Sequence, residues 1–244
     1  MSEDATSIRF RHENECTYIV IDRVDRNNMV TLPMIGTLAN GFRSLPRETK
    51  VVHLTGAGTD FCRGRDPQSD PIATSATEIR ALLLDPILDL YDAISACPVP
   101  IVCSVRGAAR GFGAALSVAC DITIAAADAR FSLPEMERNI PPTLAMSAML
   151  QRVGPKALAY LVYSTAEISA DLAEKFGLAS VVVPNDELSA AVDKLLGNLR
   201  SRSKSALVAV KTFQSTAPGL LPRAKSVLAA EILANVVSSR HGSQ

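Results

Sequence analysis

The stretch from 107 to 121 combines residues that could stabilise negative charge during a reaction. It follows the apolar run 100–105, and Gly107, Gly111 and Gly113 leave its backbone free to approach a ligand. The apolar residues after Gly113 predict a buried helix that starts there. Unpaired N–H groups at a helix N-terminus can form an oxyanion hole around a carbonyl oxygen. The alternative is that the glycines only let a helix pack tightly on a strand.

Carboxylates, rather than histidines, are the side chains that could carry catalysis. His12, His53 and His241 are scattered, so neither a Ser-His-Asp triad nor a histidine metal site is supported, and no metal is expected. The chain lacks G-x-x-x-x-G-K-[ST] and a complete G-x-G-x-x-G, which excludes the usual nucleotide-phosphate loops. Acid–base chemistry therefore falls to Asp and Glu, with backbone N–H groups as electrostatic partners.

Four motifs that are weak individually become specific through their order and spacing. They lie at 51–66, which includes Phe-Cys-Arg-Gly, and at 98–113, 120–121 and 131–135. In this arrangement the chain resembles the crotonase (enoyl-CoA hydratase/isomerase) superfamily, and the likeness continues through 168–183 and the helical tail. The resemblance implies an α/β fold built as a spiral of ββα units, with a C-terminal helical region for oligomerisation. It also implies an acyl-CoA thioester as the substrate.

The resemblance also assigns roles around the proposed hole. It implies that the thioester carbonyl lies between the backbone N–H groups of Arg65 and Phe112, and that Glu135 acts as the acid/base. Such a hole suits thioester chemistry because an enolate concentrates charge on that oxygen. We expect an apolar pocket to raise the pKa of Glu135, the alternative being a surface carboxylate after a proline.

Ala115 is where this chain departs from the family pattern. Hydratases of the family usually have two glutamates, and the first of their positions is occupied here by Ala115. Hydration is most easily run with one group that activates water and another that handles the α-proton. A single carboxylate suffices to move a proton between C2 and C4, so standard hydratase activity is in doubt. Glu137 and Asp66 could supply a second acid, or they are solvated loop charges.

Basic residues near these loops are candidates for binding the coenzyme A part of the substrate. Arg63, Arg65 and Arg110 either bind its phosphates or a substrate carboxylate, or point into solvent. Arg26 stands where the family often has a basic residue, and Lys211 would reach the coenzyme A of a neighbouring subunit. Coenzyme A is expected within the substrate, with no prosthetic group. The other binding candidates lie beside the hole: Gly64, Asp66, Gly111 and Gly113.

Alternating strands and helices must position these residues. Continuous apolar runs at 51–55, 101–105 and 122–126 predict buried parallel strands in a layered α/β fold. Two further strands, 7–12 and 16–22, are predicted to form a hairpin.

Two helical regions complete the expected fold. A capping box at Ser75 and Glu78 opens a helix that Pro86 should break or kink. In the tail, apolar residues recur at helical spacing, which predicts helices. The tail contains more Ala, Val and Leu than a single helical layer on the surface needs, so part of it is expected to pack against another subunit. We therefore expect a core over 1–190, a helical region over 191–244, and a homotrimer or hexamer.

The overall composition excludes several classes of protein. The 25 Lys and Arg residues equal the 25 Asp and Glu residues, which argues against nucleic-acid or membrane-surface binding through bulk charge. The five cysteines show no C-x-x-C spacing, and several lie in apolar runs, which favours a reducing cytoplasm. No signal peptide is recognisable, and no apolar run reaches the ~18 residues of a membrane span.

Three functions remain open at this point. The first is an acyl-CoA lyase or isomerase of the enoyl-CoA hydratase/isomerase type, working through an enolate with Glu135. The second is a crotonase-fold hydrolase that cleaves a carbon–carbon or thioester bond, with Asp66 or Glu137 aiding water. The third is a catalytically impaired CoA-binding member, which Ala115 permits. The sequence does not specify the acyl group.

Overall fold

The larger of two sheets forms the centre of the protein, whose computed structural model describes residues 7–241. Its six strands run in the order β1-β2-β3-β4-β6-β9, and all neighbours are parallel except the β1–β2 hairpin. The predicted hairpin and buried parallel strands are thus confirmed. The strands are Ile8–Glu13 (β1), Cys16–Ile21 (β2), Val51–Gly56 (β3), Ile101–Val105 (β4), Ile122–Ala126 (β6) and Val181–Val183 (β9).

A second, three-stranded sheet is absent from the sequence-based prediction. It consists of Ala108–Arg110 (β5), Arg130–Ser132 (β7) and Ile168–Ser169 (β8), in the order β5-β7-β8. Strands of two or three residues are too short to show an apolar period. This sheet matters for the site because β5 and β7 bring the glycine stretch beside the segment that carries Glu135.

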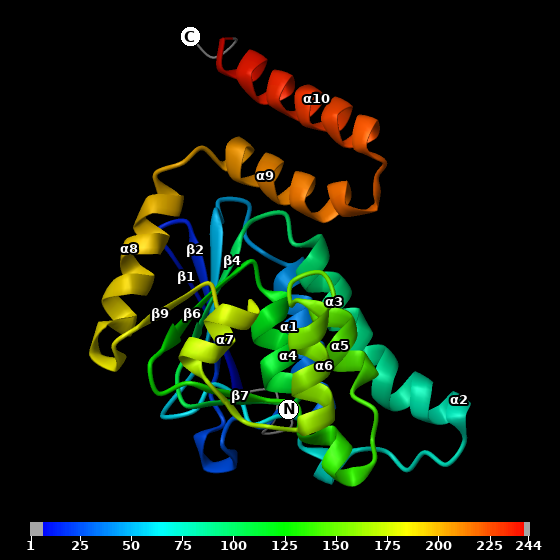
Figure 1. Cartoon of the computed structure of the whole chain (residues 1–244). Coiled ribbons are helices and arrows are strands. Elements are labelled where there is room, and N and C mark those ends of the chain that lie inside the picture. The colour runs from blue at the N-terminus through cyan, green and yellow to red at the C-terminus, as the bar shows by residue number, and fades with distance from the viewer. Residues whose placement is uncertain (1–6, 242–244) are drawn as a thin grey trace.

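Helices cover both faces of the larger sheet (Figure 1). On one side lie α1 (Leu32–Arg43), α3 (Asp85–Ala96) and α4 (Phe112–Ala119), and on the other side lies α8 (Leu188–Arg200). Every residue of α4 is buried, as its continuous apolar sequence predicts. The start of α4 is therefore held rigidly by packing on all sides.

The helix after the long loop is interrupted as expected. Ser75 accepts a hydrogen bond from the Glu78 N–H, and the complete capping box begins α2 (Ala76–Ile79). A π-helical turn over Arg80–Leu84 then joins α2 to α3, in which Pro86 is the second residue. The remaining α-helices before the tail are α5 (Thr143–Met149), α6 (Pro155–Ser164) and α7 (Ala170–Phe176).

The tail consists of three helices that differ in how they pack. Val192 and Leu196 of α8 are buried against the larger sheet. The division into a core over 1–190 and a helical region over 191–244 stays a prediction. By contrast, α9 (Lys204–Thr216) and α10 (Pro222–His241) extend past the end of the sheet (Figure 1). Between residues 7 and 241 no helix has the length and hydropathy needed to cross a membrane.

Lys211 attaches α9 to the core through a buried ion pair. Its Nζ lies 2.7 Å from both carboxylate oxygens of Asp121, which follows α4. Asp121 also accepts the N–H of Ile101 at the start of β4. Lys211 is only 5% exposed, so it joins elements of its own chain rather than reaching outward to a neighbouring coenzyme A as expected.

Replacing Lys211 by Met is expected to lower the free energy of unfolding by about 2 kcal/mol, because it removes the two charge-assisted hydrogen bonds to Asp121 and leaves that carboxylate with Arg152 at 3.8 Å as its remaining cation. Urea denaturation measures the change, and Lys194→Met on the exposed side of α8 is the matched control. Adding Asp121→Asn should recover part of the loss, since the carboxylate charge that lost its nearest cation is then gone. Equal midpoints for Lys211→Met and Lys194→Met would contradict this assignment.

Candidate active site

The loop after β3 lies directly against the glycine stretch. The Cys62 N–H donates to the Ala108 carbonyl, and the Arg110 N–H donates to the Cys62 carbonyl, each over 3.0 Å. A Cβ on Gly113 would lie 2.1 Å from the Cys62 carbonyl oxygen, so this close approach requires glycine. The backbone around Arg65 is thereby held next to the start of α4.

Arg65 and Phe112 each present a backbone N–H that donates no hydrogen bond within residues 7–241. Phe112 is the first residue of α4, where an N–H has no intrahelical acceptor. Gly111 precedes it with φ +55°, a conformation that favours glycine. Arg65 forms a β-bridge with Val30, in which the Val30 N–H donates to the Gly64 carbonyl and the Asp66 N–H donates to the Val30 carbonyl. The N–H of Arg65 itself is therefore directed away from Val30.

Glu135 lies beside this helix start. It follows β7 in a 3-10 turn over Pro134–Arg138, and the Gly111 N–H donates to the carbonyl of Ser132 in β7. A Cβ on Gly111 would lie 2.7 Å from Glu135 Oε1, which shows how closely the carboxyl group approaches the backbone there. The structure thus brings Glu135 next to the residue that precedes the Phe112 N–H.

The carboxyl group of Glu135 has one buried oxygen without a partner between residues 7 and 241. Its Oε2 is buried and has no hydrogen-bond partner among the described residues. Burial raises the pKa of Glu135, against the opposing effects of its own N–H and of the charges of Arg138 and Arg110. The direction expected from the sequence is confirmed, and a carboxylate with a raised pKa is a stronger base.

The same raised pKa predicts a pH-dependent effect on stability. Because the folded pKa exceeds the unfolded one, the native state binds more protons between the two values and stability falls as pH rises through that window. Glu135→Gln is therefore expected to be more stable than the wild type at neutral pH and equally stable below both pKa values. Urea titrations over a pH series test this, and a difference independent of pH would contradict it.

Tyr91 is a neighbour of the site that the sequence gives no reason to select. It belongs to α3, and its ring stacks on that of Phe112 with centroids 6.5 Å apart and planes 15° apart. Burial and then the charge of Glu135 raise the pKa of the Tyr91 phenol, so it stays neutral. In the sequence it is one aromatic residue in an amphipathic helix, and no local pattern separates it from core residues.

The arginines near the hole are all paired with acidic residues. The side chains of Arg63 and Arg110 remain about half exposed in these pairs, and their role in binding coenzyme A or a substrate carboxylate stays a prediction. Asp60, one of the acidic partners, also accepts the Ala108 N–H over 2.8 Å and so ties the loop to β5. The pairs are Arg63 Nε with Asp60 at 2.8 Å, Arg65 Nη1 with Asp70 at 2.8 Å, and Arg110 Nη2 with Glu137 at 3.6 Å.

Asp66 is a buried structural carboxylate. It accepts hydrogen bonds from Arg23 Nη1 at 2.7 Å and from the Gln68 N–H at 3.1 Å. Burial opposes ionisation, but the hydrogen bonds from Arg23 and Gln68 lower the pKa of Asp66 below its ordinary value. It is therefore not set up to donate a proton. Arg23, which the sequence did not single out, is the partly buried cation that pairs with Asp66, whereas Arg26 is half exposed, 3.9 Å from Asp25.

The region that would hold a second glutamate is apolar. Ala115, nearly one turn into α4 from Phe112, is fully buried within the hydrophobic core. Glu137 is 53% exposed and is paired with Arg110. Over residues 7–241 no group of three or more His, Cys, Asp or Glu side chains could hold a metal ion. Glu135 is thus the carboxyl group that lies beside Gly111 and the start of α4.

Sequence comparisons identify relatives along most of the chain. A family model described as enoyl-CoA hydratase/isomerase matches residues 11–234. A Mycobacterium tuberculosis protein named "Probable enoyl-CoA hydratase" is 31% identical over 249 residues, covering 91% of this chain and 93% of that protein. A crotonyl-CoA hydratase of Syntrophomonas wolfei is 35% identical over 119 residues, covering 48% of this chain and 46% of that protein.

Solved structures share the same architecture. An enoyl-CoA hydratase from Mycobacterium smegmatis has a TM-score of 0.88 at 22% identity, covering 93% of this chain and 90% of that one. A Thermobifida fusca protein in complex with acetoacetyl-CoA has a TM-score of 0.86 at 25% identity, covering 96% of both chains. These likenesses confirm the crotonase fold expected from the motifs. The sequence and structure together place the chain in the enoyl-CoA hydratase/isomerase (crotonase) family of enzymes.

Proposed function

We propose that the protein acts on an acyl-CoA thioester through an enolate that two backbone N–H groups stabilise, with Glu135 as acid/base. The observation that carries the proposal is the buried, unpartnered Glu135 Oε2 beside Gly111 and the free Phe112 N–H. The family membership supports it, and so does the acetoacetyl-CoA bound by the Thermobifida fusca homologue. Coenzyme A is part of the substrate in this proposal.

In the proposed reaction the thioester oxygen accepts hydrogen bonds from the N–H groups of Arg65 and Phe112. The Glu135 carboxylate removes a proton from C2 of a 3-enoyl thioester, or from C4 of a 2-enoyl thioester. The electron pair left behind moves onto the thioester oxygen, where the two donors stabilise the charge. The protonated Glu135 then returns the proton to a different carbon, which completes a double-bond shift.

Among the activities of the family, we favour proton transfer over hydration. Ala115 puts a buried methyl group where a second carboxylate would activate water, and Asp66 and Glu137 are paired with Arg23 and Arg110. Hydration is the second candidate, because relatives similar to this chain are named as hydratases. Cleavage of a thioester or carbon–carbon bond has less support, because neither Asp66 nor Glu137 is free to activate water.

We also propose that the tail forms a homotrimer or a dimer of trimers. Exposed apolar side chains on α9 and α10 include Val210, Leu233 and Val237. Such side chains favour burial against another subunit. A cytoplasmic location fits the five free, buried cysteines.

One experiment separates these activities. Short- and medium-chain 2-enoyl- and 3-enoyl-CoA thioesters are incubated with the protein in deuterated water. A double-bond shift with deuterium incorporation, and without free thiol, supports proton transfer. A hydroxyacyl product assigns hydration, release of free thiol assigns cleavage, and binding without turnover assigns a catalytically impaired member. Absence of any CoA affinity in calorimetry would overturn the proposal as a whole.

A further inference from the structure

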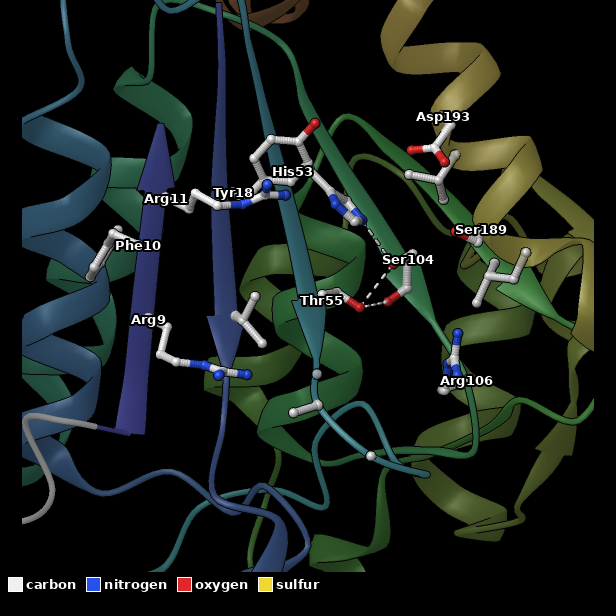
Figure 2. A pocket seen from close by; sticks show the side chains of 16 residues that line it. Arg9, Phe10, Arg11, Tyr18, His53, Thr55, Ser104, Arg106, Ser189 and Asp193 are labelled. Atoms are coloured by element: carbon white, nitrogen blue, oxygen red, sulfur yellow. Dashed lines mark hydrogen bonds between the residues drawn. The ribbon is translucent and has the colours of Figure 1, made fainter. Parts of the chain in front are cut away.

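A cavity of about 660 Å³ lies on the face of the larger sheet that carries α8 (Figure 2). Its floor is formed by β1 to β4, and its wall by the first turns of α8, including Leu188 and Val192. Glu135 lies with α4 on the opposite side of this sheet, so the cavity is separate from the proposed active site. The established family activity gives the cavity no role.

The strand register explains which side chains face the cavity. Tyr18 is opposite His53 in the β2–β3 pair, and Thr55 is opposite Ser104 in the β3–β4 pair. Residues two apart on a strand point to the same face, so one face collects His53 and Thr55 from β3. The aromatic ring of Tyr18 meets the edge of the His53 ring with centroids 5.9 Å apart.

A chain of hydrogen bonds fixes the floor in one arrangement. Thr55 Oγ1 donates to the Ser104 carbonyl over 3.3 Å, and Ser104 Oγ donates to Thr55 Oγ1 over 2.9 Å. Ser104 Oγ is then the acceptor for His53 Nε2 at 2.9 Å, which makes His53 a neutral ring with its proton on Nε2. Burial lowers the pKa of His53 to about 4, against the opposing charge of Asp193, so the ring stays neutral at physiological pH.

Asp193, His53 and Ser104 have the composition of a hydrolytic triad, but the floor of the cavity is not built to catalyse acyl transfer. Ser104 is 5% exposed and lies in the middle of a sheet, where N–H groups of β3, β4 and β6 are used in parallel pairing. No pair of free donors is therefore aimed at a tetrahedral intermediate from these strands. The arrangement suits binding rather than acyl transfer.

The charges around the cavity favour an anion at one end. Arg9 is paired with Asp22 at 3.0 Å, and Arg11 is paired with Glu13, so both carry local counter-charges. The Arg106 guanidinium forms no ion pair or hydrogen bond with any residue from 7 to 241. Figure 2 places Arg106 at one end of the cavity and Asp193 towards the other.

We propose that this cavity binds a small phosphate monoester with an apolar or aromatic body, with the phosphate at Arg106. A guanidinium forms paired, charge-assisted hydrogen bonds with phosphate oxygens. The body of the ligand lies over the floor beside Val20 and beside the Tyr18 ring, which Arg11 covers at 4.3 Å from its centroid, with the first turns of α8 as the wall. Asp193 repels the anionic group and so sets the orientation of the ligand.

The test uses phenyl phosphate as the probe and the imidazole C–H signals of His53 in two-dimensional NMR as the readout, assigned with His53→Gln. Saturable shifts of the His53 signals are expected in the wild type. Arg106→Ala should weaken binding by about tenfold or more, since a charge-assisted pair with phosphate is lost. Arg47→Ala removes another exposed arginine far from the cavity and should bind as the wild type does.

Three results would overturn the proposal. They are unshifted His53 signals at saturating probe, equal affinity in Arg106→Ala and Arg47→Ala, and an affinity for inorganic phosphate as high as that for phenyl phosphate. Arg106 is exposed, so its replacement leaves the core intact, and an unchanged thermal midpoint checks this. Acyl-CoA turnover does not enter the readout, so failure here leaves the proposed function untouched.

Discussion

Glu135→Gln is expected to lower kcat for proton transfer by about 10²- to 10⁴-fold, the usual contribution of a positioned acid/base. The amide has nearly the same shape as the carboxyl group, so it should fit against Gly111 without moving α4. It cannot accept a proton from carbon, however. The affinity for the CoA thioester should change little, because in the proposed reaction the backbone N–H groups of Arg65 and Phe112, rather than this side chain, hold the thioester oxygen. Deuterium incorporation and steady-state kinetics measure the two effects separately.

Glu137→Gln is the matched control for this prediction. It makes the same chemical change two residues away, at a carboxylate that is 53% exposed and paired with Arg110. We expect its kcat to stay within a few-fold of the wild type. If Glu135→Gln turned over every accepted thioester at the wild-type rate, Glu135 would not be the acid/base.

Phe112→Pro is expected to lower kcat by about 10²- to 10³-fold, which is the usual effect of removing one donor of an oxyanion hole. Phe112 is the first residue of α4, and proline is well tolerated at that position because the missing N–H has no intrahelical acceptor. Gly111 before it has no side chain to clash with the proline ring. The substitution therefore removes the N–H without breaking the helix.

Phe112→Ala separates the loss of the N–H from the loss of the ring. Both variants lose the stacking on Tyr91, but only the proline variant loses the donor. We expect Phe112→Ala to keep most of its kcat, and the ratio between the two variants to report the hydrogen bond. Circular dichroism should show equal helix content in both. Equal kcat values would assign the oxyanion interaction to a different group.

The larger sheet and its helices were predictable from the sequence because their signals are local. Continuous apolar runs marked β3, β4 and β6, the capping box marked the start of α2, and Pro86 marked the interruption before α3. The smaller sheet was not predictable, since β5, β7 and β8 contain only two or three residues each. Their pairing depends on where the larger elements place them.

For the site, the order of the motifs indicated Glu135, Arg65 and Phe112, and the fold brings their segments together. The partners of the charged side chains were not predictable. Arg23 reaches Asp66 across 43 positions, and Lys211 reaches Asp121 across 90. No local pattern distinguishes such a residue from a solvated charge or a ligand contact. Tyr91 likewise became a neighbour of the site only through the packing of α3 on α4.

Cys62, whose carbonyl oxygen lies against Gly113, has a consequence for the chemistry of thiols near the substrate. Its side chain is fully buried, and burial raises the pKa of the thiol to about 12. Only a thiolate attacks a thioester or a disulfide. Although Cys62 lies three residues before Arg65, it therefore stays protonated, neither taking the acyl group from a bound thioester nor forming a mixed disulfide with coenzyme A. Burial thus keeps this thiol from reacting with the acyl-CoA thioester of the proposed reaction.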